Sequence, residues 1–125
     1  MIWLAVAVGG ALGSMARHGV NMLFSHVLER AVPYATGAVN LIGSAAIGLL
    51  AALLATGRLH MSNELRTFVF VGILGGFTTF SSFMLDTFTL GHGGGHSLAF
   101  WNVAVQTTFG LAAVWAGYRV GLSVG

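Results

Sequence analysis

Long apolar stretches alternate with short polar interruptions along the chain. A helix that crosses a membrane needs about 20 consecutive, mostly apolar residues. Stretches of that length occur at about residues 2–28, 34–56, 62–89 and 97–124, and the connections between them are short. The pattern therefore predicts an all-α membrane protein, with residues 1–125 forming a single domain of four transmembrane helices.

The third stretch contains a run of small, hydroxylated and aromatic residues. Residues 75–83 read Gly-Gly-Phe-Thr-Thr-Phe-Ser-Ser-Phe. Adjacent glycines followed by β-branched threonines are poor material for the middle of a helix, so we predict a helix break here. Non-helical backbone at membrane depth is tolerated only where protein or a water-filled cavity satisfies its polar groups. The run is therefore a candidate ion or substrate site, and the alternative is a glycine-rich packing face with the phenylalanines in the core.

Composition supports a membrane environment. The chain of 125 residues is 56% hydrophobic and only 6% charged, whereas soluble domains carry about 25% charged residues. Its cationic side chains are five arginines scattered along the chain, which do not form a basic patch for nucleic acid. The chain has no cysteine, which excludes disulfides and thiolate metal sites.

Small residues recur at four-residue spacing in every predicted span. Such spacing lets helix backbones approach closely in lipid. The groups are Gly9/Gly13, Ser44/Gly48, Gly72/Gly76 and Ala113/Gly117/Gly121. Because helices of this size enclose little by themselves, we expect an oligomer, most simply a dimer.

The arginines indicate an orientation only weakly. Cytoplasmic loops of membrane proteins carry an excess of Lys and Arg. One side of the predicted bundle holds Arg58, Arg66 and Arg119, and the other holds Arg30, with Arg17 deeper in its span. Because this bias is small, we hypothesise that the chain inserts in both orientations and pairs antiparallel with its own copy.

Few side chains could carry enzyme chemistry. The acids are Glu29, Glu64 and Asp86, and the histidines do not converge in the sequence. His92 and His96 have a spacing seen in metal sites, but no third ligand accompanies them. No nucleophile–base arrangement or phosphate-binding loop is present. The sequence therefore predicts a protein that is not an enzyme.

Arg17 and Asn40 are the candidate functional side chains in the predicted spans before the break. Arg17 is well inside the first span, where a charge is costly unless it is paired or hydrated, so it is a functional candidate. The alternatives are an arginine that reaches the interface, or a structural pair with Asp86. Asn40, at the entry to a very apolar run, could donate to an anion or a carbonyl. Its alternative role is a hydrogen bond between helices.

Phe80 and Phe83 share a helix face if the helix resumes after the break. An aromatic ring has a positive edge, so rings presented edge-on favour a small anion without a full positive charge. A full charge would trap the ion, and conduction requires that the ion leave again. The alternative is that both rings are ordinary core residues.

Hydroxyl groups surround the predicted break. Thr78, Thr79, Ser81 and Ser82 belong to the run, and Thr107 in the last span could continue a polar track. We count Thr79, Ser81 and Thr107 among the candidate pore residues. A broken helix also exposes carbonyls that could hold a cation such as Na⁺. The alternative for these hydroxyls is bonding back to their own helix.

The order and spacing of three motifs resemble the CrcB/Fluc family of fluoride channels. The motifs are Gly9-Gly10…Gly13…Arg17, then Thr36…Val39-Asn40…Gly43, then the run 75–83 with Asp86. The resemblance covers essentially the whole chain. It implies a four-span antiparallel, dual-topology homodimer with two fluoride pores and a structural Na⁺ at the dimer centre. It also implies passive, selective export of cytoplasmic fluoride across the bacterial plasma (inner) membrane.

The resemblance implies roles for single residues. Gly75 and Thr78 occupy the positions whose carbonyls hold Na⁺. Asn40, Phe80 and Phe83 match pore positions, and Arg17 matches an arginine near a pore vestibule.

The chain also departs from the family pattern. Ser82 stands where Thr is common. In the last span Val103 falls where Tyr is expected and Leu111 where a second hydroxyl can occur, so Thr107 is the one match to the polar track.

Two other functions fit four short apolar helices. A small dual-topology multidrug transporter resembles this chain in size, but such proteins carry a membrane-embedded Glu in the first span, and this span has no acid before Glu29. A non-transporting membrane-complex subunit or holin-like pore would need only the small-residue faces, which leaves the run 75–83 unexplained.

Overall fold

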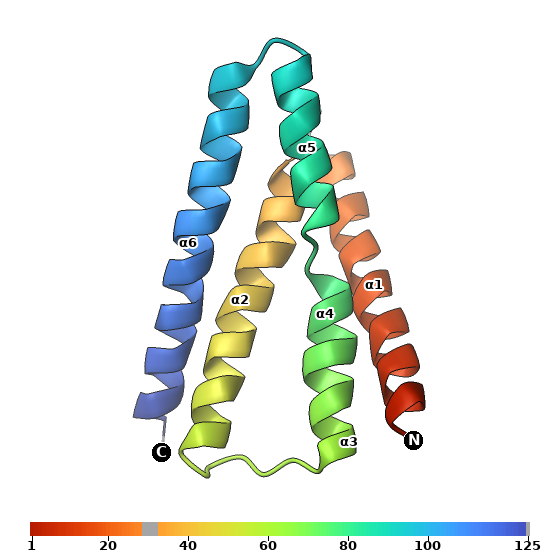
Figure 1. Ribbon diagram of the computed structural model, residues 1–125, viewed down its shortest axis with the longest axis vertical. Helices are drawn as coiled ribbons and strands as arrows, with labels where there is room; N and C mark the ends of the chain where they lie inside the picture. The colour runs from red at the N-terminus through yellow and green to blue at the C-terminus, as the bar shows by residue number, and fades with distance from the viewer. Residues whose placement is uncertain (29–32, 125) are drawn as a thin grey trace.

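The computed structural model describes residues 1–28 and 33–124, and in this part of the chain every regular element is helical (Figure 1). The helices are α1 (Ile2–Val27), α2 (Tyr34–Ala55), α3 (Asn63–Arg66), the π-helix η1 (Thr67–Leu74), α4 (Gly75–Phe77), α5 (Ser81–His92) and α6 (His96–Ser123). Their outer bounds lie within three residues of the predicted stretches. The all-α prediction is confirmed. Glu29 and Arg30, which the charge comparison used, lie outside the described residues.

Within residues 1–28 and 33–124, three segments are long and apolar enough to cross a membrane: Tyr34–Ala55, Asn63–His92 and His96–Ser123. The first helix, α1, has 26 residues and is long enough, but it is not in this group. Arg17 and His18 lower the hydropathy of its second half. A fourth span through α1 therefore stays a prediction.

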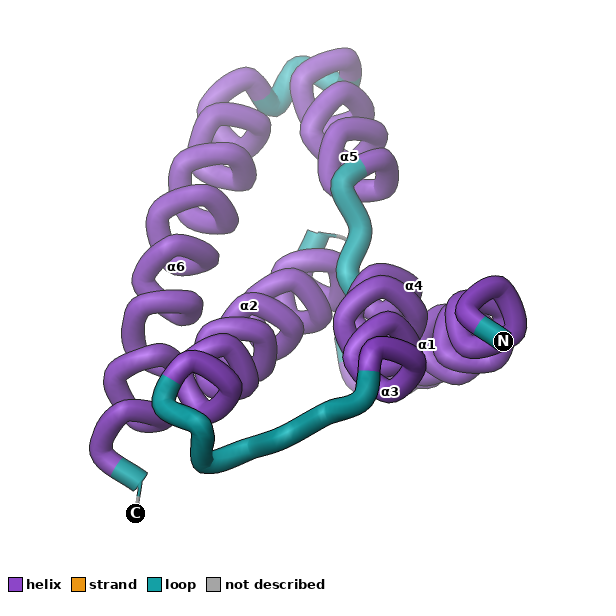
Figure 2. Tube along the Cα trace, turned by 60° about the horizontal axis from the view of Figure 1, so that its bottom comes forward, coloured by secondary structure: helices purple, strands orange, loops and turns teal. Residues whose placement is uncertain are grey.

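The helices pack in two layers that meet at the break. The axis of α2 runs along α6, whereas α1 runs along η1 and α4 (Figure 1). Beyond the break, α5 leaves α4 and pairs with α6, as Figure 2 shows from below. The two termini and the α2–α3 connection lie at the same end of the molecule (Figure 1).

Glycines allow these close helix contacts. A Cβ at Gly48 would collide with a carbonyl of α6, and one at Gly117 would collide with a carbonyl of α2. At Gly9 and Gly13 a Cβ would meet the backbone of η1. The predicted close approach is confirmed, and these contacts lie within one chain. They therefore do not by themselves argue for a dimer.

The helix break is where we predicted it, but the glycines do not cause it. Gly75 is helical, with φ −63° and ψ −36°, and Gly76 belongs to α4. A Cβ at Gly76 would lie 2.7 Å from the carbonyl oxygen of Gly10, so this glycine serves the contact with α1. The chain becomes extended at Thr78, with φ −84° and ψ 162°, and helix returns at Ser81.

The π-helix before the break was not predicted. Eight residues, Thr67–Leu74, form it. A π-helix carries i→i+5 bonds and is rare, and its short forms often lie at functional sites. Here the element leads directly into α4 and the break.

Candidate functional site

Thr79 is the centre of the break, and Asn40 of α2 satisfies both of its backbone groups. The Thr79 N–H donates to Asn40 Oδ1 at 2.8 Å, and Asn40 Nδ2 donates to the Thr79 carbonyl at 3.0 Å. In a continuous helix the Thr79 N–H would bond to the carbonyl of Gly75. The side-chain amide of Asn40 therefore replaces the helical partner. This is how the chain tolerates extended backbone at membrane depth.

The side chain of Thr79 starts the next helix. Its Oγ1 accepts a hydrogen bond from the Ser82 N–H at 3.2 Å, as a capping hydroxyl does. Among the described residues the Thr79 hydroxyl donates no hydrogen bond, so its hydrogen can be donated to another group. Thr78 differs, because its hydroxyl donates back to the Leu74 carbonyl at 2.9 Å, which is the alternative fate we gave these residues.

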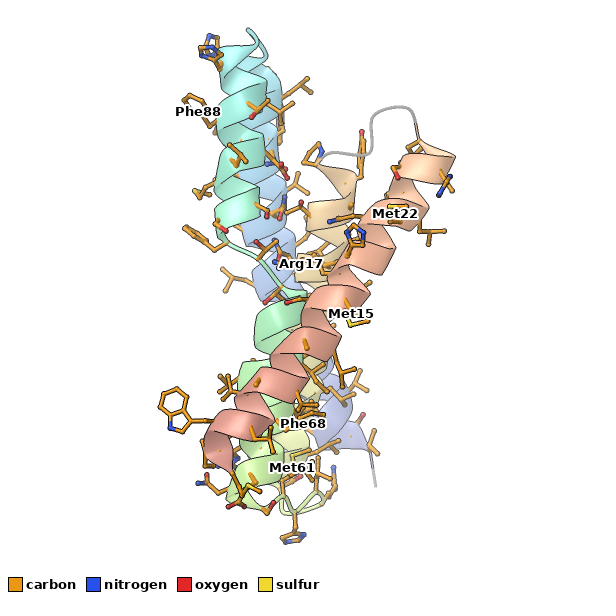
Figure 3. All side chains as sticks on the ribbon, turned by 90° about the vertical axis from the view of Figure 1, so that its right-hand side faces the viewer. Met15, Arg17, Met22, Met61, Phe68 and Phe88 are labelled. Carbon is orange, nitrogen blue, oxygen red and sulfur yellow. The ribbon has the colours of Figure 1, made fainter. Side chains whose placement is uncertain are left out.

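Arg17 lies beside the break (Figure 3), and its Nη1 donates to the Thr78 carbonyl at 3.3 Å. The side chain is half-buried. Its hydrogen bond goes to this carbonyl and not to Asp86, so the alternative of a structural pair with Asp86 is wrong. In the described part of the chain, Asp86 Oδ2 is buried without a hydrogen-bond partner.

Two cavities flank the break, and Thr79 borders both. The aromatic cavity has a volume of about 370 Å³, and its lining includes Asn40, Ser44, Gly75, Thr78, Phe80 and Phe83. The polar cavity has a volume of about 270 Å³, and its lining includes Ser14, Arg17, His18, Asn21, Thr36 and Ser82. One backbone segment thus separates an apolar-walled space from a space with an arginine in its wall.

Phe80 and Phe83 form an edge-to-face pair in the aromatic cavity. Their ring centroids are 6.2 Å apart and their planes make an angle of 86°. Phe83 is 9% exposed, so it is buried as the alternative of a core residue predicts. Phe80 is 73% exposed and is not a core residue of this chain. The predicted shared face is confirmed.

Not every predicted site residue lies at the break. Ser81 is exposed at the start of α5, and Thr107 is exposed on α6. Neither lines the aromatic or the polar cavity. Their pore roles stay predictions.

Two buried amides on α6 belong to the site and were not predicted. Gln106 and Asn102 are each 8% exposed. Gln106 Oε1 accepts from Asn40 Nδ2 at 2.9 Å, and Gln106 Nε2 donates to Asn102 Oδ1 at 2.9 Å. Gln106, one residue before Thr107 on α6, therefore lies beside Asn40. Two amides four residues apart in an apolar span were a pattern that could have identified them.

The carbonyls at the end of α4 fit a hard cation in part. Gly75 and Thr78 both line the aromatic cavity. Because the Thr79 N–H is bound to Asn40, the Gly75 carbonyl is free of its usual helical partner. Carbonyl oxygens at a broken helix suit Na⁺. The Thr78 carbonyl already accepts a hydrogen bond from the guanidinium of Arg17. A cation bound to this carbonyl would therefore lie close to the positive charge of Arg17.

The chain is similar to known proteins over nearly its whole length. Residues 4–118 match the family described as CrcB-like protein, Camphor Resistance (CrcB). A protein of Paracoccus denitrificans (strain Pd 1222), named fluoride-specific ion channel FluC, is 49% identical over 120 residues, which cover 95% of this chain and 93% of the relative. A protein of the same name from Allorhizobium ampelinum is 44% identical over 116 residues, covering 93% of this chain and 92% of the relative.

Proposed function

The chain belongs to the CrcB-like protein family, and from this premise we propose that it is a fluoride-selective ion channel. The relatives that it matches along nearly their whole length are named as fluoride-specific channels and not as enzymes. The observation that carries the proposal within this chain is the break itself. Asn40 holds it open between an aromatic cavity and a polar cavity.

Fluoride must exchange its water for protein groups along the proposed path. The Thr79 hydroxyl has a free hydrogen and borders both cavities. The edges of Phe80 and Phe83 add weak positive charge beside it. Both N–H groups of Asn40 already donate to other acceptors, so we assign Asn40 the role of holding the path and not of binding the ion. Weak groups of this kind let the ion enter and leave.

We also propose that each copy spans the bacterial inner membrane four times and that two copies assemble as an antiparallel homodimer. Phe80 is largely exposed in the single chain, and a Cβ at Gly75 would have a single neighbour, at 3.7 Å. Both features leave room for a second copy. Carbonyls of Gly75 and Thr78 from each copy would then hold a structural Na⁺, whose charge would tie the copies together.

The dual orientation has a direct test. Reporter tags at the C-terminus, probed for accessibility from each side of the membrane, are expected to be found on both sides in comparable amounts. The reason is the small arginine bias of the chain. Tags found on one side only, in every preparation, would contradict antiparallel assembly.

The proposed transport is tested with purified protein in liposomes. Fluoride efflux is expected to exceed chloride efflux by at least about a hundredfold, because ring edges and one hydroxyl suit a small anion. Replacing Na⁺ by a large organic cation on both sides is expected to reduce the fluoride flux. Equal fluoride and chloride fluxes would refute the selective channel, and Na⁺-independent flux would refute only the cation site.

A further inference from the structure

The orientation of the Asn40 amide depends in part on Gln106, a residue that the proposed path does not account for. Asn40 Oδ1 accepts from the Thr79 N–H, and Asn40 Nδ2 donates to the Thr79 carbonyl and to Gln106 Oε1. A side-chain amide has two N–H groups, so Asn40 has no donor left. Gln106 is the only one of these partners that belongs to a side chain, and it lies 66 residues away on α6.

A chain of hydrogen bonds continues from Gln106 to α5. Gln106 Nε2 donates to Asn102 Oδ1 at 2.9 Å, and Asn102 Nδ2 donates to Thr87 Oγ1 at 2.9 Å. The Thr87 hydroxyl donates to the Phe83 carbonyl at 2.8 Å. We call these four side chains, Asn40, Gln106, Asn102 and Thr87, the amide chain.

Both ends of the amide chain impose the same direction on it. A backbone carbonyl can only accept, so the Thr87 hydroxyl donates to Phe83 and its oxygen accepts from Asn102. Asn102 must then present its oxygen to Gln106, and Gln106 must present its oxygen to Asn40. At the other end the Thr79 N–H can only donate, which requires Asn40 Oδ1 to face it. An amide turned over at any link would place two donors or two acceptors together.

Burial makes this direction costly to reverse. Gln106 and Asn102 are each 8% exposed, and the Gln106 amide lies against Gly37 of α2, where a Cβ would be 3.8 Å from its Cδ. Water therefore cannot easily replace a lost partner, and an unpaired buried polar group is expensive.

We propose that Gln106 is a positioning residue for the break: it locks the Asn40 amide in the one orientation that can hold both backbone groups of Thr79. The inference deepens the proposed function, since the segment it holds borders the fluoride path. Asn102 and Thr87 then also help to position the break, because their hydrogen bonds connect it to α6 and to the second turn of α5.

Hydrogen–deuterium exchange of the Thr79 amide, in the full-length protein in lipid nanodiscs, tests the lock without any ion flux. Gln106→Met removes the acceptor with little change of volume and is expected to speed this exchange about five- to tenfold, the effect of losing one typical hydrogen bond. Asn102→Leu is expected to have a smaller effect in the same direction, and Thr87→Val a smaller one again. When it is protonated, the carboxyl of Gln106→Glu offers an oxygen to Asn40 and a hydroxyl to Asn102 Oδ1, so at acidic pH this variant should exchange nearly as the wild type does.

The matched control removes an amide far from the break. Asn63 is exposed at the start of α3, so Asn63→Ala should leave the exchange unchanged. Wild-type exchange in Gln106→Met, or equal effects of all three substitutions, would overturn the proposal. If Gln106→Met does not fold, Asn102→Leu decides in the same way. Fluoride efflux is measured separately: faster exchange in a protein that never conducts fluoride would support the lock and refute the proposed function.

Discussion

Asn40→Leu is expected to abolish fluoride flux and to lower the stability of the protein by about 3 kcal/mol or more. The substitution removes three hydrogen bonds at once. It leaves the Thr79 N–H, the Thr79 carbonyl and Gln106 Oε1 without their partner. Gln106 is buried and Thr79 is half-buried, and an unsatisfied polar group costs about 1–3 kcal/mol when it is buried and less where water reaches it. If the native geometry of the break loses about 3 kcal/mol of free energy relative to its alternatives, its population falls by roughly a hundredfold or more.

Two measurements separate the parts of this prediction. Thermal unfolding in detergent reports the stability, and liposome efflux reports the flux. Asn63→Ala again serves as the control, because it deletes an exposed amide outside the break. Normal efflux from Asn40→Leu would mean that the break does not need the Asn40–Thr79 pairing, and the assignment of Asn40 as its holder would be wrong.

Phe80→Ile is expected to reduce fluoride flux at least about tenfold while changing the stability by less than about 1.5 kcal/mol. Phe80 is 73% exposed, and among the described residues its aromatic partner is Phe83, at 6.2 Å between ring centroids. Loss of that pair costs about 0.5–1.5 kcal/mol. Isoleucine keeps the apolar surface but has no positive ring edge, so the loss of flux would report the edge itself.

Phe88→Ile is the matched control for this experiment. Phe88 lies on α5, the helix that Phe80 directly precedes, is 66% exposed, and stands clear of the break (Figure 3). Its ring stacks on His92 and does not reach the aromatic cavity. The companion substitution Phe83→Ile should also reduce flux, but it changes a buried side chain, so its stability loss must be subtracted. Full conduction by both variants would exclude the aromatic-edge mechanism.

The candidate site shows where reasoning from spacing stops. Thr107, which we predicted to continue a polar track, directly follows Gln106 in the sequence. A helix turns 100° per residue, however, so a shift of one position moves a side chain to another face. The structure places Gln106 against Asn40 and leaves Thr107 exposed. Which side chain of α6 points toward Asn40 depends on how α6 is rotated about its axis relative to α2. This rotation cannot be derived from one sequence.

The glycines of the break illustrate a different limit. Helix propensity correctly marked residues 75–79 as a weak point, but propensity is a small term that tertiary contacts override. Gly76 is helical because α1 packs directly on it. The backbone becomes extended at Thr78 instead, and side chains from α1 and α2 supply the hydrogen bonds of Thr78 and Thr79.

The sequence by itself determined the all-helical class, the positions of the helices and the place of the break. These follow from local quantities: the length of each apolar stretch, and the residues that a helix or a membrane accepts poorly. Only the tertiary structure decided which groups hold the break. Asn40 is 39 residues from Thr79, Arg17 is 61 residues from Thr78, and Gln106 is 66 residues from Asn40. Such pairings depend on helix rotation and close packing, because a hydrogen bond forms only within a few tenths of an ångström of its preferred length.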